Sequence, residues 1–270
     1  MTQKYEQEFT IKPVGIVHAE PSDPSEISIY GLKKDSYIEI FPEYQQALTR
    51  IEENSHLWIL LWFHQANRSM LKMSPGINRN LPEYGVFSLR APHRPNPIAL
   101  THVYLERCEG CNLYVSGLDA IDGTPVLDIK PYHEGDIIFE PRTPYMPPAR
   151  PAMRRDRFFK QALEHHKEIC IGLWMGVRMA LVAEEFLGHL NREDVLVEVT
   201  GSRCLADVVQ GLSRARLANP ARFSFQESST IQSSRWTKKD RRIELTARSG
   251  YSIDQWENGQ PEDLFIIQKD

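Results

Sequence analysis

Residues 90–100, which read RAPHRPNPIAL, place several side chains that can bind a ligand on a short, stiff piece of backbone. Three prolines within seven residues restrict this backbone, so little conformational entropy would be lost on binding. Interleaved with the prolines are Arg90, His93, Arg94 and Asn96. Arginine is an always-charged donor for carboxylate or phosphate, and asparagine can both donate to and accept from a purine edge. The pattern favours a binding segment, and a proline-stiffened surface loop is the alternative.

Two further segments carry polar groups where strands are expected to end. Residues 55–65 (SHLWILLWFHQ) predict a strand over 57–63, buried on both faces, that ends in His64 and Gln65. Residues 117–132 (GLDAIDGTPVLDIKPY) contain a turn signature at 122–125. This second segment holds three carboxylates, which are Asp119, Asp122 and Asp128. Such groups often serve a site, but a strand that simply meets water or a carboxylate that caps a turn would give the same pattern.

The elements expected around these segments divide the chain into two halves. Strands are predicted over 9–17, 37–41, 57–63, 84–89, 99–106 and 112–118, with a short helix over 42–53, which favours a barrel or sandwich. Five prolines in residues 141–151 exclude regular structure there and indicate a linker. Helices over 153–166, 169–190 and 205–212 then accompany strands over 195–199, 223–225 and 243–246, an α+β order. The predicted domains are 1–140 and 152–270, joined by 141–151.

Composition limits the classes of function. A chain of 270 residues with 41% hydrophobic side chains can form two packed domains. Its formal charge of −4 means that RNA binding would have to rest on local basic runs, at 142–160 and at 235–242. The second run contains Trp236 as an aromatic platform, although a solvated face is the usual meaning of such runs. Without a signal peptide, a membrane span or a cysteine framework, we expect a soluble cytoplasmic protein.

The three segments with chemistry resemble one family in order and spacing. Residues 85–99 (GVFSLRAPHRPNPIA), 55–65 and 118–132 are similar to signature segments of the TsaA/TrmO family, and residues 11–20 (IKPVGIVHAE) fit its first strand. That family comprises β-barrel, S-adenosylmethionine-dependent methyltransferases that modify N6-threonylcarbamoyladenosine beside the tRNA anticodon. The resemblance covers roughly residues 8–145. It implies a closed antiparallel barrel, a homodimer and a cofactor held near the subunit interface.

Carried over by position, the resemblance assigns a set of cofactor contacts. These are His64, Gln65, Arg90, Leu100, Leu118, Asp119, Ala120 and Ile121. Substrate contacts are expected from Arg94, Asn96 and Lys130. Methyl transfer needs alignment and an acceptor for a proton, for which Asp122 and His93 are candidates. Ala91 and Ala99 replace the family's serine and glycine, and residues 26–30 stand where the family has a Pro-Arg-Gln loop.

The second half resembles a different family, FmdE, named for formylmethanofuran dehydrogenase. That family has a His-x-His-x-Cys-Pro-Gly start to a long helix and a later Cys-x-x-Asp-x-x-Gln. Here the matching positions are His166, Cys170, Gly172, Cys204, Asp207 and Gln210. Two thiolates and an imidazole suit a soft metal such as zinc, so His166, Cys170 and Cys204 form a metal-site hypothesis. Two buried cysteines that pack as small apolar residues are the alternative. Cys108 and Cys111 lack a second pair and are interpreted as hairpin residues.

These observations leave three functions open. Methyl transfer to tRNA adenosine N6 is the leading hypothesis. Because the second half departs from the usual tRNA enzyme, the acceptor could instead be a small molecule or a metallocofactor-related compound. A non-enzymatic protein that senses the cofactor or handles a metal is the third.

Overall fold

The computed structural model describes residues 9–20, 22–23 and 36–270 of the chain. The chain divides into two compact units, of which the first holds residues 1–76 and 81–137 and the second holds 77–80 and 138–270. The proline-rich segment 141–151 therefore belongs to the second unit by its contacts. Among the described residues, no helix combines the length and the apolar character needed to cross a membrane.

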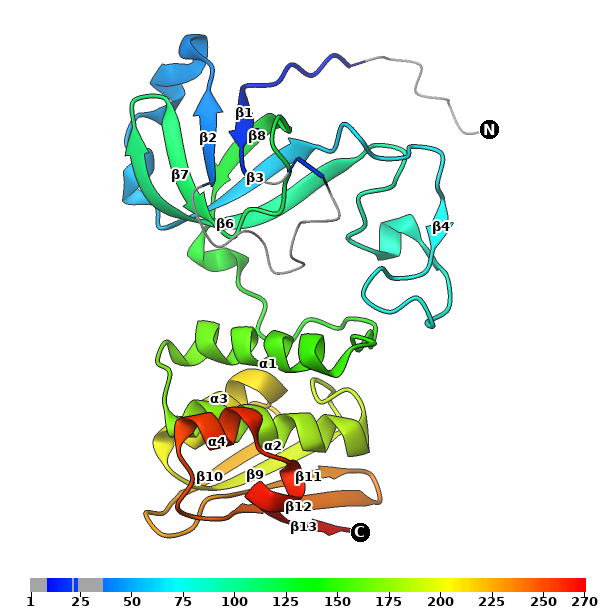
Figure 1. Cartoon of the computed structure of the whole chain (residues 1–270), viewed down its shortest axis with the longest axis vertical. Coiled ribbons are helices and arrows are strands. Elements are labelled where there is room, and N and C mark those ends of the chain that lie inside the picture. Colours follow the sequence, from blue (N-terminus) through cyan, green and yellow to red (C-terminus); the bar gives the residue numbers. More distant parts are fainter. Residues whose placement is uncertain (1–8, 21, 24–35) are drawn as a thin grey trace. The chain divides into compact units, whose positions relative to one another are not determined.

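The first unit is a closed antiparallel barrel (Figure 1), which confirms the fold expected from the sequence. Its strands are β1 (Gly15–His18), β2 (Ser36–Ile40), β3 (His56–Trp62), β6 (Ile98–Glu109), β7 (Asn112–Ser116) and β8 (Pro125–Pro131). Around the barrel they follow the order β1-β2-β7-β6-β3-β8, and β1 pairs with β8 to close it. Short 3-10 helices lie at Pro42–Leu48 (η2), Ile51–Glu53 (η3), Val86–Ser88 (η4) and Glu134–Asp136 (η5), and a small ribbon pairs β4 (Lys72–Met73) with β5 (Tyr84–Gly85).

The barrel core follows from the two-residue period of its strands. Strand β3 buries Leu57, Ile59 and Leu61 completely, while the side chains between them are only partly covered. The prediction that this strand is buried on both faces is therefore wrong, because an antiparallel barrel covers only its inner face. The partly covered face carries Trp58, which lies opposite His102 of β6.

Residues 84–89 are also not the strand that was predicted. Only Tyr84–Gly85 pairs in a ribbon, and the 3-10 helix η4 follows at once. The Arg94 guanidinium donates hydrogen bonds to the Val86 carbonyl and, at 2.8 Å, to the Leu89 carbonyl. These carbonyls are thereby satisfied inside the loop instead of in a ladder.

The second unit is an α+β fold, also as predicted. Its sheet has the order β10-β9-β11-β12-β13, formed by β9 (Val195–Gly201), β10 (Phe223–Glu227), β11 (Ser233–Lys238), β12 (Arg241–Ala247) and β13 (Phe265–Lys269). Only the β9–β10 pair is parallel. The helices α1 (Pro151–His166), α2 (Ile171–Leu187), α3 (Arg203–Ser213), α4 (Ile253–Asn258) and α5 (Pro261–Leu264) complete the unit, and the longer helices lie on one side of the sheet (Figure 1).

Glycines let α2 approach α3 closely. A Cβ at Gly172 would lie 2.6 Å from the Cys204 Cβ, and one at Gly176 would lie 2.5 Å from a Val208 methyl. Residues four apart share one face of a helix, so these positions form a smooth contact surface on α2. The close approach brings the N-terminal ends of the two helices together, which matters for the site described below.

Candidate functional site

The loop after β3 and the proline segment lie against each other in the first unit. The Phe63 N–H donates to the Pro97 carbonyl at 2.9 Å, and the Arg68 guanidinium donates to the Pro95 carbonyl at 2.9 Å. The Asn67 N–H donates to His93 Nδ1 at 3.0 Å. The structure thus places His64 and Gln65, both exposed, directly beside the segment 93–97.

Arg90 and Asp119 meet the same short stretch of β6. The exposed Arg90 guanidinium donates to the Leu100 carbonyl at 3.2 Å. The next residue, Thr101, is buried and donates its hydroxyl to Asp119 Oδ1. A cation and a carboxylate are therefore positioned on consecutive residues of one strand. We call Arg90, Leu100, Thr101 and Asp119 the β6 polar cluster.

In the segment 117–125, which we call the acidic turn, the residues next to Asp119 can offer a ligand their backbone groups more than their side chains. Leu118 and Ala120 are fully buried and Ile121 is 4% exposed, so their side chains belong to the barrel core. Any contact these residues make with a bound molecule must come from their backbone. Gly117, with a positive φ of 87°, turns the chain from β7 into this segment.

The two candidate proton acceptors, Asp122 and His93, differ in the hydrogen bonds that their side chains already make. Asp122 Oδ1 accepts from the Ala19 N–H at 3.1 Å, and His18 Nδ1 lies 3.9 Å from the same oxygen. His93 Nδ1 accepts from Asn67, so the neutral ring carries its hydrogen on Nε2 and has no lone pair left there. Asp122 is the better acceptor by this geometry, because its side chain is 52% exposed and a carboxylate has a second oxygen.

The expected substrate contacts lie in different surroundings. Arg94 is engaged with two loop carbonyls and its Nε is buried. Asn96 is exposed beside β6, whereas Lys130 lies on β8 opposite Trp58 and pairs with Asp128 at 2.7 Å. The part of the pocket expected from residues 26–30 lies outside the described residues.

Two features of this unit were not foreseen. Thr101, which orients Asp119, has a polar side chain at an inward-facing position of β6, and that mismatch with the strand pattern is the signal that could have found it. The second feature is an aromatic cluster on the barrel surface, formed by His56, Trp58, His102, Tyr104 and Tyr132. Its members come from three strands or strand ends, so only their pairing brings them together.

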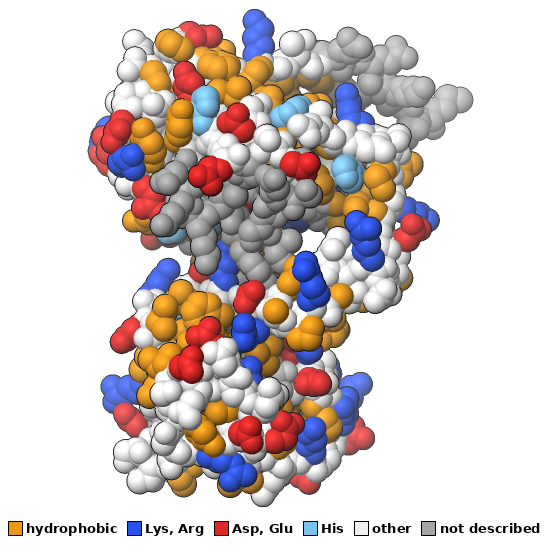
Figure 2. Space-filling model, viewed as in Figure 1, with side chains coloured by type: hydrophobic (Ala, Val, Ile, Leu, Met, Phe, Trp, Pro, Cys, Tyr) orange, Lys and Arg blue, Asp and Glu red, His pale blue; other side chains and the backbone are white. Residues whose placement is uncertain are grey.

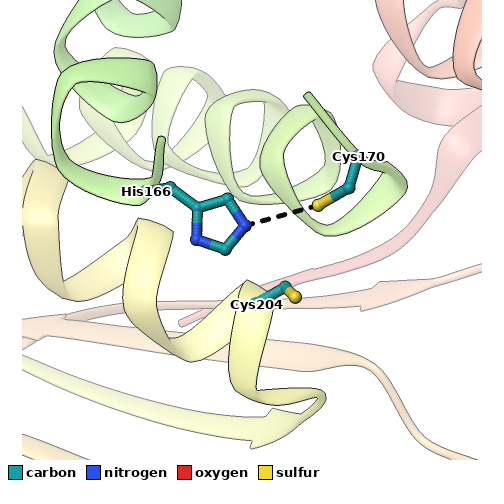
Figure 3. Close-up of side chains that lie close together, drawn as sticks. All are labelled: His166, Cys170 and Cys204. Carbon is teal, nitrogen blue, oxygen red and sulfur yellow. Dashed lines mark hydrogen bonds between the residues drawn. The ribbon is translucent and has the colours of Figure 1, made fainter. Parts of the chain in front are cut away.

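The second unit brings the predicted metal ligands together. His166 is the last residue of α1, Cys170 is the N-cap of α2, and Cys204 lies in the first turn of α3. One ligand atom from each residue lies within 4.8 Å of the others (Figure 3). Ligand atoms of a tetrahedral zinc site are roughly 3.3–3.8 Å apart, given bonds of about 2.0–2.3 Å, so small side-chain rotations would complete the set.

A carboxylate holds the histidine of this set in place. Asp207 Oδ2 lies 2.8 Å from His166 Nδ1 and its Oδ1 lies 3.1 Å from His165 Nε2. The other nitrogen, His166 Nε2, lies 3.4 Å from Cys170 Sγ, as the dashed line in Figure 3 marks. A carboxylate on one ring nitrogen is the arrangement that presents the other nitrogen to a metal.

The surroundings of Cys204 change the acidity of its thiol. Burial, followed by the neighbouring Cys170 thiol and Glu168, raises the pKa of Cys204. A cation beside the Cys204 thiol would offset this effect and favour the thiolate, which is the form that binds a metal. Cys170 and Cys204 are partly covered instead of sealed in the core, so packing alone does not explain their position beside His166. The residues present therefore fit a soft divalent metal.

The basic run at 235–242 does not form an aromatic platform. Trp236 is completely buried and donates through its indole N–H to Ser234 at 2.9 Å. Arg235 pairs with Glu198 at 2.8 Å and with Glu244 at 2.9 Å. The interpretation of Trp236 as a base-stacking residue is wrong, because the strand alternation of β11 turns it into the core. Figure 2 shows acidic and basic side chains interspersed on the face in view.

Comparison with known proteins matches both units to families. Residues 19–135 match the tRNA-methyltransferase O N-terminal domain, and residues 165–248 match FmdE, molybdenum formylmethanofuran dehydrogenase operon. The chain is 45% identical over 131 residues to a probable S-adenosyl-L-methionine-binding protein of Methanothermobacter thermautotrophicus, covering 48% of this chain and 93% of that one. The chain belongs to the TrmO family, with an FmdE domain after the barrel.

Other relatives match smaller shares of their own length. A probable S-adenosyl-L-methionine-binding protein of Archaeoglobus fulgidus is 38% identical over 218 residues, covering 77% of this chain and 59% of the relative. A tRNA (adenine(37)-N6)-methyltransferase of Mus musculus is 51% identical over 94 residues, covering 34% and 22%. The crystal structure of TrmO from Pseudomonas aeruginosa is 34% identical with a TM-score of 0.40, covering 53% of this chain and 63% of that one.

The metal site can be tested by composition. We expect the purified chain to carry close to one equivalent of zinc by inductively coupled plasma mass spectrometry, and Cys170→Ser or Cys204→Ser to lose most of it, because each removes one of three ligands. Cys108→Ser, at the barrel hairpin, is the matched control and should keep the metal. Metal-free wild-type protein that is folded by circular dichroism would contradict the assignment.

Proposed function

We propose that the chain is an S-adenosylmethionine-dependent methyltransferase that works in the cytoplasm and methylates N6 of threonylcarbamoyladenosine in tRNA. Membership of the TrmO family and the β6 polar cluster carry this proposal. The names of the Methanothermobacter and Mus relatives give it further support, since the first is described as a cofactor-binding protein and the second as a tRNA adenine methyltransferase.

The residues of the β6 polar cluster fit the groups that the cofactor presents. Arg90 is exposed and uses one N–H on Leu100, so its other donors can bind a carboxylate. Asp119 is oriented by Thr101, and a fixed carboxylate accepts well from hydroxyls or an amino group. The backbone at 118–121 follows the barrel wall and can pair with an adenine edge. The exposed His64 and Gln65 lie beside the proline segment that carries Arg90.

The chain's own contribution to the reaction is alignment and proton acceptance. When bound, the cofactor supplies an activated methyl group. Asp122 is our candidate for the group that takes the proton from the acceptor nitrogen. The hydrogen bond from the Ala19 N–H fixes one of its oxygens and orients the other. His93, whose Nδ1 is occupied by Asn67, acts as a positioning group for the loop.

The outer face of the barrel supports a homodimer. Ile98 is 37% exposed and Leu100 is 47% exposed on β6, opposite Trp62 and Leu60 of β3. Together with the aromatic cluster they form an apolar stripe, which is a common mark of a protein interface. Because Leu100 also accepts from Arg90, a partner on this stripe would lie beside the β6 polar cluster.

Dimerisation can be measured by sedimentation velocity. We expect the wild-type chain to sediment as a dimer and Leu100→Glu to sediment as a monomer, because a charge would be buried in the interface. Phe87→Glu, on an apolar residue that is 83% exposed and lies outside the stripe, is the control and should leave the dimer intact. A monomeric wild type at micromolar concentration would exclude this part of the proposal.

Cofactor binding has a direct calorimetric test. Arg90→Ala should weaken S-adenosylmethionine binding by about tenfold or more, since a charge-assisted hydrogen bond is lost. Arg50→Ala removes an arginine of the same unit that is 75% exposed and pairs with Glu53, and this variant should bind as tightly as wild type. Equal affinity in Arg90→Ala would show that the cofactor binds elsewhere.

Methyl transfer can be followed with tritiated S-adenosylmethionine. We expect label in bulk tRNA, and Asp122→Asn should lower the rate by about 10²–10⁴-fold with cofactor affinity unchanged, because an amide can still cap Ala19 but cannot take a proton. Asp128→Asn, on a carboxylate of the same segment, is the control. Label in a small-molecule extract instead of tRNA would favour the second candidate below.

The metal ligands favour one second candidate. We propose that His166, Cys170 and Cys204 hold zinc in the FmdE domain, where three protein ligands would leave a fourth position open. An open metal position in the same chain as a methyltransferase barrel is compatible with an acceptor that is a small molecule or a metallocofactor-related compound. Tight cofactor binding with label in neither pool would instead favour a sensing role.

A further inference from the structure

A cavity of about 360 Å³ lies in the second unit, away from the three metal ligands. It is lined by α1, by the middle of α2 and by the residues that join α4 to α5. Three arginines face it, which are Arg154, Arg155 and Arg178. The proposed methyl transfer uses none of them.

Arg178 carries its charge into a covered position. It lies in the middle of α2, between the buried Val177 and Met179. Its guanidinium donates to the Gly259 carbonyl, and the described residues offer it no salt bridge within 4.0 Å. Burial, and then the nearby Arg155, lower the pKa of Arg178. A guanidinium stays charged in proteins, so this position holds an uncompensated cation.

The neighbouring arginines differ in how they are compensated. Arg154 is neutralised by the buried Glu184, at 2.6 Å. Arg155 donates to the Glu257 carbonyl at 3.4 Å, and its closest carboxylate, on the exposed Asp156, lies 4.0 Å away, beyond hydrogen-bond length. The exposed Glu185 also lines the cavity but does not balance both Arg155 and Arg178.

The start of α1 adds to the positive electrostatic potential in the cavity. The first turn after Pro151 contains no acidic side chain, and the side chain of the N-cap residue Arg150 accepts no hydrogen bond from the free N–H groups of this turn. The helix dipole at this end is positive. Two half-covered arginines that repel each other therefore border a cavity whose backbone also favours negative charge.

We propose that this cavity binds the phosphate group of an organic phosphate. A phosphate carries enough negative charge to balance two guanidinium groups and offers several acceptors to their fixed donors, which a single carboxylate does not. The cavity is larger than a phosphate, and Leu181 and Val182 give the remaining space an apolar wall. The Gln260 amide can pair with polar groups of the organic part. The phosphate can belong to a small molecule or to a nucleotide of RNA.

Calorimetry of the full-length chain with inorganic phosphate and with AMP tests this site. We expect both to bind the wild type, and Arg178→Gln and Arg155→Gln each to weaken binding by about tenfold or more. Arg155→Gln alters a partly exposed residue, so the test holds even where Arg178→Gln changes stability. Arg142→Gln, on a 78% exposed arginine of the same basic run, is the matched control and should bind normally.

The outcomes distinguish a specific phosphate site from general attraction to a positively charged surface. They also identify the molecule to which the phosphate belongs. Absence of binding to both probes at millimolar concentration, or equal loss in Arg142→Gln, would overturn the proposal. If Arg178→Gln also weakens tRNA binding and AMP competes with tRNA, the phosphate belongs to RNA. If tRNA binding is unaffected while AMP binding is lost, the ligand is a small organic phosphate.

Discussion

Closure of the barrel by β1 and β8 is the constraint on which the candidate cofactor site depends. Gly15 pairs with Val126 at this seam, and a Cβ at Gly15 would lie 2.4 Å from the Glu39 carbonyl oxygen on the neighbouring strand. The seam continues into the acidic turn, where the Val17 N–H donates to the Thr124 carbonyl at 2.9 Å and the Gly123 N–H donates to the Val17 carbonyl at 2.9 Å. Asp122 is thereby held against the end of β1.

The pairing of β3 with β6 completes the arrangement from the other side. It aligns the end of β3 with the start of β6, so that the Phe63 N–H after β3 donates to the Pro97 carbonyl before β6. Prolines stiffen one of these loops, and Arg94 satisfies its inner carbonyls. Arg90 then reaches the Leu100 carbonyl while Thr101 orients Asp119. The candidate binding residues of the barrel thus lie on or next to loops whose positions are fixed by the paired strands. Loops on a rigid scaffold commonly carry binding residues, because they are exposed to ligands and still held in place.

The second unit depends on a different constraint, the close contact of two helices. Because Gly172 and Gly176 have no side chains, α3 can lie close enough for Cys204 to reach Cys170 and His166. Asp207, one turn further along α3, then fixes the imidazole. The same helix α2 carries Arg178 toward the arginine-lined cavity. The helix α2 therefore contributes to two separate sites. Its start carries one of the candidate metal ligands, and its middle carries one of the arginines that line the cavity.

Much of this protein could be predicted from local sequence pattern. The resemblance of three motif segments indicated the family. The residues at 37–41 predicted the strand β2, and the long apolar pattern of 169–190 predicted the helix α2. These succeed because side-chain period and turn chemistry act over a few residues.

Only the tertiary structure decided which distant residues meet. Trp236 in a basic run turns into the core, and Thr101 supports a carboxylate 18 residues away. Residues 86–89 leave the strand where Arg94 binds the carbonyls of Val86 and Leu89. Cys204 lies 34 positions after Cys170, and Arg155 approaches Arg178 only because α1 packs on α2. Local pattern specifies which face of an element is apolar, but the partner that covers that face is chosen by packing of the whole unit. For that reason the ligands and motifs could be read from the chain, whereas the metal geometry and the arginine-lined cavity could not.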